Sequence, residues 1–433
     1  MKSIWSEYKT EKFEPLQGDC SCDVLIVGGG IAGILCAYFL QKAGIDNLLV
    51  EGGRICSKIT KNTTAKITAQ HGIIYSKLIE KFGEIKAKQY LNYNLWAIKK
   101  YAVLAREFPC DFEEKPAFTY SLVDRKVIEE EVSAVNRLGF NASFEESIPL
   151  PLNIKGAIKF PNQAQFNPVM FIDGLSRKQN IKEHTFVTKI KNNIAYTNNG
   201  NIRARKIIIA THFPFINKYG LYFMKLYQSR SYVIALENAS DLNGMYVDNE
   251  QNGMSFRNYK DLLLIGGGDH KTGKPGGRFE ELRNFAKTFY PNANERYSWS
   301  NQDCMSLDSI PYIGVYSKLS PDIFVATGFN KWGITSSMIG AKILTDMVLE
   351  KKNNNAEIFS PNRSMLSKQL AINITEAIKN LLYPTTKRCS HLGCALKWNE
   401  AEHTWECPCH GSRYDSDGRL IDNPATKDIH VKK

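Results

Sequence analysis

The sequence lacks the features that would mark a repetitive, fibrous or disordered chain. It has no internal repeat, and its 30 glycines and 16 prolines fit no collagen-like or low-complexity class. Hydrophobic residues make up 43% of the 433 residues and charged residues 23%, which is an ordinary globular composition. At roughly 150 residues per domain, this length predicts two or three domains with a sizeable core.

Signals for secretion, membrane insertion and nucleic-acid binding are also lacking. The first residues contain no apolar stretch followed by small residues. The longest apolar stretch, residues 24–40, contains four glycines and is interpreted as a strand, a turn and a helix. The net charge of +12 comes from dispersed lysines interleaved with acids. We therefore expect a cytoplasmic protein with no membrane span and no nucleic-acid partner.

The cysteines are distributed unevenly. Four of the ten lie between Cys389 and Cys409, which argues against a disulfide framework spread over the chain. The other six have no metal-ligand spacing and are predicted to be ordinary thiols: Cys20, Cys22, Cys36, Cys56, Cys110 and Cys304.

The hydrophobic pattern predicts alternating strands and helices at both ends of the first 350 residues. Strands are expected at 23–27, 48–51, 206–211, 262–265 and 323–326, and helices at about 31–44, 75–107 and 333–349. Between 110 and 195, frequent prolines and short alternating segments predict antiparallel sheet and loops. Residues 192–202 are interpreted as a hairpin with an Asn-Gly turn.

A glycine motif lies between the first strand and the first helix. Its residues are Gly28, Gly29, Gly30, Ile31, Ala32 and Gly33, which fit G-x-G-x-x-G. The glycines allow a tight turn, close approach to a pyrophosphate and close packing of helix on strand, and the helix N-terminus favours the phosphate charge. Glu51 ends the second strand, where a carboxylate can bind ribose hydroxyls. The alternative is a glycine-rich turn with no ligand.

A second glycine-rich run, residues 266–273, does not repeat the motif. Lys271 stands where the third glycine is required, and a polar segment follows instead of an apolar helix. This run is interpreted as a loop near a ligand. A single dinucleotide site favours FAD alone over a separate nicotinamide site.

The stretch from Trp5 to about Val348 resembles flavoproteins of the D-amino-acid oxidase superfamily, which includes glycine, sarcosine and γ-glutamylputrescine oxidases. The resemblance is carried by the glycine motif with Glu51 and by the runs 61–72, 210–215, 308–314 and 326–335. It implies that Thr64, Ala65 and Lys66 lie along the flavin and that Val187 contacts the adenine side. It also implies that Gly328, Gly333, Ile334 and Thr335 approach the pyrimidine end, where a helix N-terminus favours negative charge on reduced flavin.

Two histidines of these runs, His71 and His212, are weak candidates for a catalytic base. A lone histidine beside apolar residues is more often a structural one. In this superfamily, amine oxidation resembles hydride transfer to the flavin and requires no obligatory side-chain base. The catalytic residue is therefore left unassigned.

The last segment contains a second constellation, C-x-H followed after 15 residues by C-x-x-H. Two thiolates and two imidazoles suit a [2Fe–2S] cluster in which Cys389 and Cys407 hold one iron and His391 and His410 the other. Imidazole ligands raise the reduction potential of such a cluster to roughly −150 to +300 mV. Zinc is the alternative metal for any set of Cys and His ligands.

These two boxes resemble the Rieske boxes of respiratory cytochrome complexes. The resemblance implies a disulfide between Cys394 and Cys409, for which two free thiols are the alternative. It also implies that Ser412 and Tyr414 donate hydrogen bonds to cluster and ligand sulfur, which favours the reduced cluster and disfavours zinc. Unlike complete Rieske domains, the segment has few strands before its first box. Either the missing base is supplied by packing on the flavoprotein body, or the module is less rigid.

Together the resemblances imply an α/β FAD-binding Rossmann-type domain with an inserted antiparallel-sheet substrate domain, plus a small all-β Rieske module. The oxidoreductase domain spans 1–360, with nucleotide-binding parts at about 20–75, 180–215 and 305–350 and substrate-domain parts at about 76–179 and 216–304. A connector at 361–384 is expected to be an amphipathic helix, since Leu366, Leu370, Ile374, Ile378 and Leu382 recur every four residues. The Rieske module spans 385–433.

The expected function is that of an FAD-dependent, dehydrogenase-like oxidoreductase. A small amine or amino acid would reduce the flavin, and the [2Fe–2S] cluster would pass electrons singly to an external acceptor such as a protein carrier. No two-histidine, one-carboxylate iron set accompanies the cluster, so hydroxylation is not expected there. The alternatives are a redox relay or sensor that turns over no metabolite and a non-catalytic interaction protein.

Overall fold

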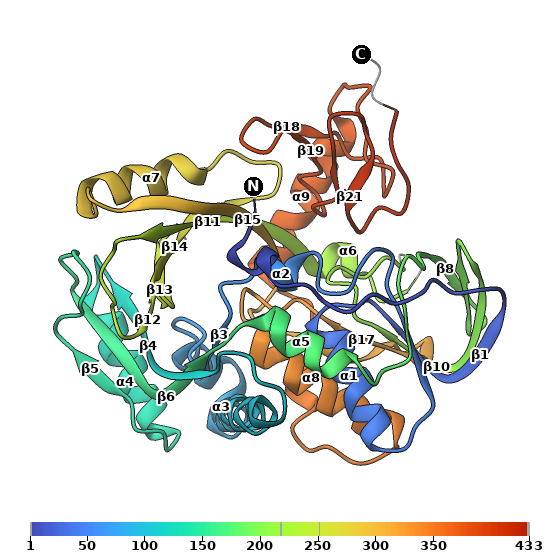
Figure 1. Cartoon of the computed structure of the whole chain (residues 1–433), viewed down its shortest axis with the longest axis horizontal. Coiled ribbons are helices and arrows are strands. Elements are labelled where there is room, and N and C mark those ends of the chain that lie inside the picture. Colours follow the sequence, from blue (N-terminus) through green and yellow to red (C-terminus); the bar gives the residue numbers. More distant parts are fainter. Residues whose placement is uncertain (1, 217–218, 251, 431–433) are drawn as a thin grey trace.

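The computed structural model describes residues 2–216, 219–250 and 252–430. Its first sheet has the strand order β16-β17-β10-β1-β2-β7, with β8 and β9 attached beside β10 (Figure 1). In this sheet β1 lies parallel to both β2 and β10, as in a dinucleotide-binding fold. The strands are β1 (Cys20–Val27), β2 (Asn47–Val50), β7 (Ile181–Lys182), β8 (Val187–Lys191), β9 (Ile194–Thr197), β10 (Gly200–Ile209), β16 (Tyr312–Ser317) and β17 (Ser320–Thr327).

The second sheet has the order β15-β11-β14-β13-β12-β4-β6-β3, with β5 paired to β6. All its pairs are antiparallel except β4 with β12. The strands are β3 (Lys66–Ile67), β4 (Glu113–Ser121), β5 (Ser143–Glu145), β6 (Gly156–Gln165), β11 (Leu226–Glu237), β12 (Met245–Asp248), β13 (Ser255–Tyr259), β14 (Leu262–Lys271) and β15 (Asn294–Ser306). The expected α/β domain with an inserted, mainly antiparallel sheet is therefore confirmed.

A third, small sheet forms the C-terminal module, drawn in red in Figure 1. Its strands are β18 (Lys397–Asn399), β19 (Thr404–Glu406), β20 (Arg413–Tyr414) and β21 (Leu420–Asp422). The helices of the described chain are α1 (Ile31–Lys42), α2 (Ile59–Asn62), α3 (Tyr75–Glu107), α4 (Arg125–Arg137), α5 (Pro168–Ser176), α6 (Tyr222–Lys225), α7 (Arg278–Phe289), α8 (Gly333–Val348) and α9 (Lys368–Leu382), with short 3-10 turns at Ile4–Glu7 and Glu357–Phe359. None of these helices is both long and apolar enough to cross a membrane.

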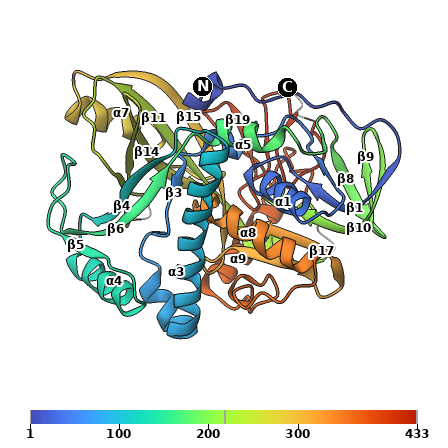
Figure 2. The ribbon, with the colours of Figure 1, turned by 60° about the horizontal axis from the view of Figure 1, so that its bottom comes forward.

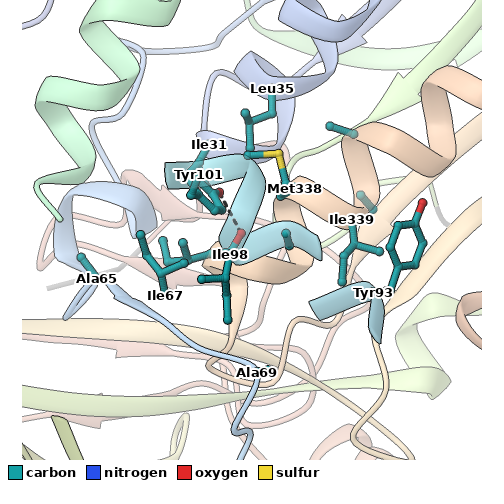
Figure 3. Packing of buried hydrophobic residues seen from close by; sticks show 14 of the residues in the cluster. Ile31, Leu35, Ala65, Ile67, Ala69, Tyr93, Ile98, Tyr101, Met338 and Ile339 are labelled. Atoms are coloured by element: carbon teal, nitrogen blue, oxygen red, sulfur yellow. Dashed lines mark hydrogen bonds between the residues drawn. The ribbon is translucent and has the colours of Figure 1, made fainter. Parts of the chain in front are cut away.

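The main apolar core lies between α1, α3 and α8 (Figure 3). Leu35 of α1 and Met338 of α8 are fully buried there, and burial of such a side chain contributes about 1.5–3 kcal/mol. Tyr101 of α3 donates a hydrogen bond of 2.8 Å to the carbonyl oxygen of Ile334. Figure 2 shows α3 in front, with α8 beside it and α1 next to α8. The first turns of α1 and α8 flank the candidate cofactor site.

Helices α4 and α5 correct the prediction of only sheet and loops between 110 and 195. The Asp124 carboxylate accepts hydrogen bonds from the amides of Lys126 and Val127 and so caps the start of α4. Asn167 caps α5 in the same way, and Pro168 occupies its first turn. Prolines break the regular pattern in this part of the sequence, but Pro168 begins a helix.

Two turn predictions were also wrong. Between β9 and β10 the turn consists of Asn198 and Asn199, and Gly200 is already paired with Thr197, so the turn is not Asn-Gly. The run that begins at Gly266 is not a loop, because β14 continues to Lys271 and pairs with β11.

Candidate functional site

A long cavity extends from the turn between β1 and α1 to the first turn of α8. Many of the residues predicted to bind the dinucleotide line it, namely Gly28, Gly29, Gly30, Ile31, Ala32, Glu51, Val187, Gly333 and Ile334. They come from four separate stretches of sequence, and the parallel sheet brings them together because strands β1, β2 and β17 end at the same edge.

The glycine turn has no room for side chains. A Cβ atom on Gly28, whose φ is 115°, would lie 2.5 Å from the carbonyl oxygen of Ala210, and one on Gly33 would overlap the carbonyl oxygen of Gly28. The Glu51 carboxylate accepts hydrogen bonds from the amides of Gly29 (2.7 Å) and Gly53 (2.9 Å). The turn is thus held close to Glu51, with bare backbone facing the cavity, as binding of a pyrophosphate requires.

The cavity is also polar inside. The Nε2 atom of His212, the Oδ1 atom of Asn301 and the Oγ atom of Ser337 are buried and have no hydrogen-bond partner within the described part of the chain. All three residues line the cavity. Buried polar atoms are normally paired, so these atoms fit a polar ligand with several donors and acceptors, such as a dinucleotide.

Other residues predicted to contact the flavin lie beside this cavity without being part of its lining. Thr64, Ala65, Lys66, Gly328 and Thr335 belong to this group, although their neighbours Thr63, Phe329 and Ile334 line the cavity. Ala65 has a left-handed backbone (φ 56°) and is fully buried. Its carbonyl oxygen accepts a 3.0 Å hydrogen bond from Arg257 of the inserted sheet. The flavin contacts of the five residues in this group stay predictions.

The two candidate histidines lie in different environments. His71 is buried, with Nδ1 2.7 Å from the Tyr90 hydroxyl and Nε2 2.9 Å from the carbonyl oxygen of Thr68. Burial lowers the pKa of His71 to about 3. His212 lines the cavity, and burial lowers its pKa to about 4. Both rings are therefore neutral at pH 7, and only His212 is placed to contact a ligand.

The C-terminal boxes form two facing loops at residues 389–394 and 407–412. The Nδ1 atoms of His391 and His410 lie 3.3 Å apart, and Cys389 and Cys407 are buried side by side. A hydrogen bond from the Cys407 thiol lowers the pKa of Cys389 to about 6. A thiol pair beside an imidazole pair fits the two irons of a [2Fe–2S] cluster.

Further residues of the module surround these four ligands. The structure joins Cys394 to Cys409 in a disulfide that links the two loops. The hydroxyl oxygen of Tyr414 lies 3.3 Å from Cys389 Sγ, and the Ser412 hydroxyl also contacts this sulfur. A compact group of three thiols, Cys394, Cys407 and Cys409, could suggest a single metal ion. Two of its members are joined to each other, so they do not offer thiolates.

Comparison with known families assigns both parts of the chain. The model of the family "DAO: FAD dependent oxidoreductase" matches residues 23–347. This chain belongs to the DAO family of FAD-dependent oxidoreductases. The model of the Rieske [2Fe–2S] domain matches residues 348–433, including the predicted connector. The DAO domain implies FAD and the Rieske domain implies a [2Fe–2S] cluster, as predicted.

Individual relatives agree with this division. A protein named for its Rieske 2Fe-2S centre, YhfW of Bacillus subtilis (strain 168), is 34% identical over 96% of this chain and 94% of its own. The cytochrome b6-f complex iron-sulfur subunit 1 of Nostoc sp. (strain PCC 7120) is 42% identical over 14% of this chain and 32% of the subunit. Glycine oxidase from Geobacillus kaustophilus has a TM-score of 0.68 at 19% identity, covering 79% of this chain and 99% of that one, and shows a shared fold.

The Rieske module of this DAO-family protein packs directly on the oxidoreductase domain. Gln228 of β11 donates a 2.8 Å hydrogen bond to the carbonyl oxygen of His410, and Gln302 of β15 donates one of 2.9 Å to that of Gly411. A Cβ atom on Gly273 would lie 2.9 Å from Pro408 in the second box. Packing on the flavoprotein body therefore takes the place of the strands that the module lacks.

A buried ionic network lies in the same interface. Arg230 of β11 pairs with Glu402, and Arg413 of β20 binds the same carboxylate at 2.6 Å. Ser300 donates a further hydrogen bond of 2.8 Å to Glu402. Burial alone would raise the pKa of Glu402, but Arg230 and Arg413 lower it to about 2. The carboxylate is therefore charged at neutral pH, and its charge is compensated from both domains.

The module also forms part of the wall of the FAD cavity, which the sequence did not predict. Lining residues lie at 420–423 in and after β21 and at Ala425 and Thr426. Asn423 donates 2.7 Å hydrogen bonds to the carbonyl oxygens of Thr211 and Phe213. Asp303 and Lys331 are further lining residues that were missed. No local motif marks these positions, because each depends on contacts between distant segments.

Proposed function

We propose that the chain is a dehydrogenase-like flavoenzyme that oxidises a small amino acid or amine. Bound FAD would take up two electrons from the substrate, and the Rieske cluster would release them one at a time to an external acceptor. A one-electron carrier beside a flavin is of little use to an oxidase that reduces oxygen directly. The fold of glycine oxidase is consistent with an amino acid substrate.

The observation that carries this proposal is the segment Thr211–Phe213 between the two cofactor sites. The ring of Phe213 lies 6.5 Å from that of His391 and 6.3 Å from that of His410. The preceding residue, His212, lines the FAD cavity. The histidine side of the cluster site therefore faces this short segment, which also borders the cavity. Such an arrangement suits electron transfer within one chain.

Two cations, the buried Arg257 and the half-buried Lys66, favour an amino acid over a simple amine. Arg257 is fully buried, and its Nε and Nη2 atoms have no hydrogen-bond partner among the residues that the structure describes. Burial and the nearby Arg257 lower the pKa of Lys66 to about 7. No described carboxylate pairs with either side chain, and uncompensated buried charge is costly. We assign the missing negative charge to the carboxylate of the substrate.

The test is an anaerobic panel of matched compounds, each amino acid paired with the amine that lacks its carboxylate. We expect amino acids to bleach the flavin absorption and then to produce the reduced-cluster EPR signal. Lys66→Met should weaken the flavin spectral shift caused by non-reactive carboxylates, measured per bound flavin. If no compound bleaches the flavin while a reduced carrier protein does, the chain is a redox relay and the enzyme proposal is wrong. Equal reactivity of the paired amines would refute the carboxylate site.

A further inference from the structure

Helix α9 exposes the side that its sequence pattern would bury. Ile378 is 53% exposed and Leu382 78% exposed, and Ile374 and Leu381 are also exposed. The buried residues of the helix are instead Asn373 and Asn380. We call Ile374, Ile378, Leu381 and Leu382, together with the exposed Leu392, the α9 face. The predicted amphipathic connector thus forms, but its apolar side is left without a partner among the described residues.

Polar contacts hold α9 in this orientation. The side chain of Asn373 donates a 3.1 Å hydrogen bond to the carbonyl oxygen of Met224, and the backbone carbonyl oxygen of Asn380 accepts one of 3.0 Å from the amide of Ala395. Glu376 pairs with Lys271 and with Lys274, the latter at 3.1 Å. Rotating the helix to bury its leucines would break all of these contacts. The exposed apolar side is therefore a built feature, and exposed patches of this kind mark interaction sites.

The α9 face continues into the first cluster loop. Leu392 follows the ligand His391 directly, and the next residue, Gly393, packs near Leu381. Arg388 ties the two segments together with hydrogen bonds of 3.0 Å to the carbonyl oxygen of Leu381 and 2.8 Å to that of Gly393. His391 is the least buried of the four cluster ligands. The outward side of the cluster site therefore opens beside the α9 face.

The segment that carries this face is basic. Between residues 366 and 398 the sequence has five cations and one acid. The acid is Glu376, which is already paired with lysines of β14 and the turn after it. The cations are Lys368, Lys379, Lys387, Arg388 and Lys397, and we call them the basic rim. A partner that covers the apolar face would meet this charge and is expected to be acidic.

We propose that the α9 face and the basic rim form the docking surface for an acidic one-electron carrier protein. The reduced cluster gives one electron to the oxidised carrier, so the cluster is oxidised and the carrier reduced, with no bond made or broken. The direction of this transfer rests on the proposed function. Phe213 lies beside the rings of both His391 and His410, so electrons would enter on that side and leave past Leu392, where the first cluster loop meets the α9 face.

The test needs no substrate, because dithionite can reduce the cluster of the purified holoprotein. Its reoxidation by an acidic blue-copper protein is followed by stopped-flow absorption, with basic cytochrome c for comparison. One variant removes the apolar side (Ile378→Gln with Leu382→Gln), and another reverses the charge (Lys368→Glu with Lys379→Glu). Ile85→Gln and Lys287→Glu are matched controls, since both residues are exposed but lie on α3 and α7.

We expect each double variant to lower the second-order rate constant with the blue-copper protein at least about tenfold, while both controls leave it unchanged. High salt should slow the natural protein but have little effect on the charge variant. Unchanged rates in both double variants, or faster reaction with cytochrome c, would overturn the proposal. The proposal would also be overturned if the natural protein formed a dimer that the Ile378/Leu382 double variant dissociates. Binding of the natural protein to anionic vesicles, abolished in the same variant, would overturn it too. These rate constants can be interpreted even if no compound of the substrate panel reduces the flavin, because dithionite supplies the electrons.

Discussion

Replacing Arg230 with Met tests whether the buried ionic network fixes the Rieske module on the oxidoreductase domain. Arg230 is 2% exposed, and the side chain of its partner Glu402 is 4% exposed. The substitution keeps the apolar length of the side chain but removes its charge. Glu402 would then be left in the interface with Arg413 as its remaining cationic partner.

The expected cost can be estimated in two ways. Breaking a buried ion pair costs about 3–5 kcal/mol, because one charge is left uncompensated. Lowering the pKa of Glu402 from 4.5 to about 2 corresponds to about 3 kcal/mol at about 1.4 kcal/mol per unit, and Arg230 and Arg413 share that effect. Because Arg413 remains, we expect the lower end, about 3 kcal/mol. The stabilisation is present above the ordinary carboxyl pKa and is lost as the pH falls from about 4.5 towards 2.

Native-state hydrogen exchange of the β19 and β20 amides measures this cost as opening of the module. A loss of about 3 kcal/mol makes exchange about 100-fold faster for these amides. Amides of β4 and β6 should be unaffected, since these strands lie at the other end of the second sheet from β11 and β15. Arg283→Met is the matched control, because its pair with Glu295 is largely exposed and is expected to contribute less than about 1 kcal/mol. If Arg230→Met changed exchange no more than this control, the network would not hold the module.

Three further predictions concern the cofactor sites. Gly33→Ala should yield protein without bound flavin, since a Cβ would overlap Gly28, whereas Gly340→Ala, where a Cβ meets only ordinary contacts, should keep flavin. Tyr414→Phe should lower the cluster reduction potential by about 50 mV in a redox titration, because one hydrogen bond near Cys389 is worth about 1 kcal/mol. The pKa of Lys66 is lowered to about 7, so the unfolded chain binds more protons above pH 7 and stability rises with pH from there towards 10. Lys66→Met should flatten this rise in thermal unfolding.

The sequence predicted those parts of the site whose chemistry resides in consecutive residues. The turn from Gly28 to Gly33 is predictable because its glycines and the helix behind it are adjacent in sequence, and the structure leaves no space for a side chain at Gly28 or Gly33. The boundaries of α3 were also predicted, at 75 and 107, because a long helical period is a strong signal. By contrast, Asn301, Asp303 and Lys331 reach the cavity only through the packing of distant segments, which leaves no local pattern.

In the connector, the sequence pattern predicts the helix correctly but does not predict which side of the helix is buried. The recurrence of Ile374, Ile378 and Leu382 predicts a helix, and the helix is there. The same recurrence normally predicts a buried apolar stripe, since burial is what stabilises such a helix. Here Asn373 and Glu376 decide the orientation through partners on other elements, and those partners cannot be read from the helix itself.

The small size of the Rieske module implies that its cluster site is completed by the oxidoreductase domain. The strands β18 to β21 are two or three residues long, and the module's own buried core consists mostly of its cysteines with Leu396, Tyr414 and Ala425. So few residues rarely supply enough burial to fold alone. Contacts such as Gln228 with His410 and Gln302 with Gly411 hold the second cluster loop from outside the module. The second cluster loop is thus held by β11 and β15, and residues 301–303 of β15 also line the FAD cavity. One sheet thus contacts both candidate cofactor sites, which is the arrangement that the proposed electron transfer within a single chain requires.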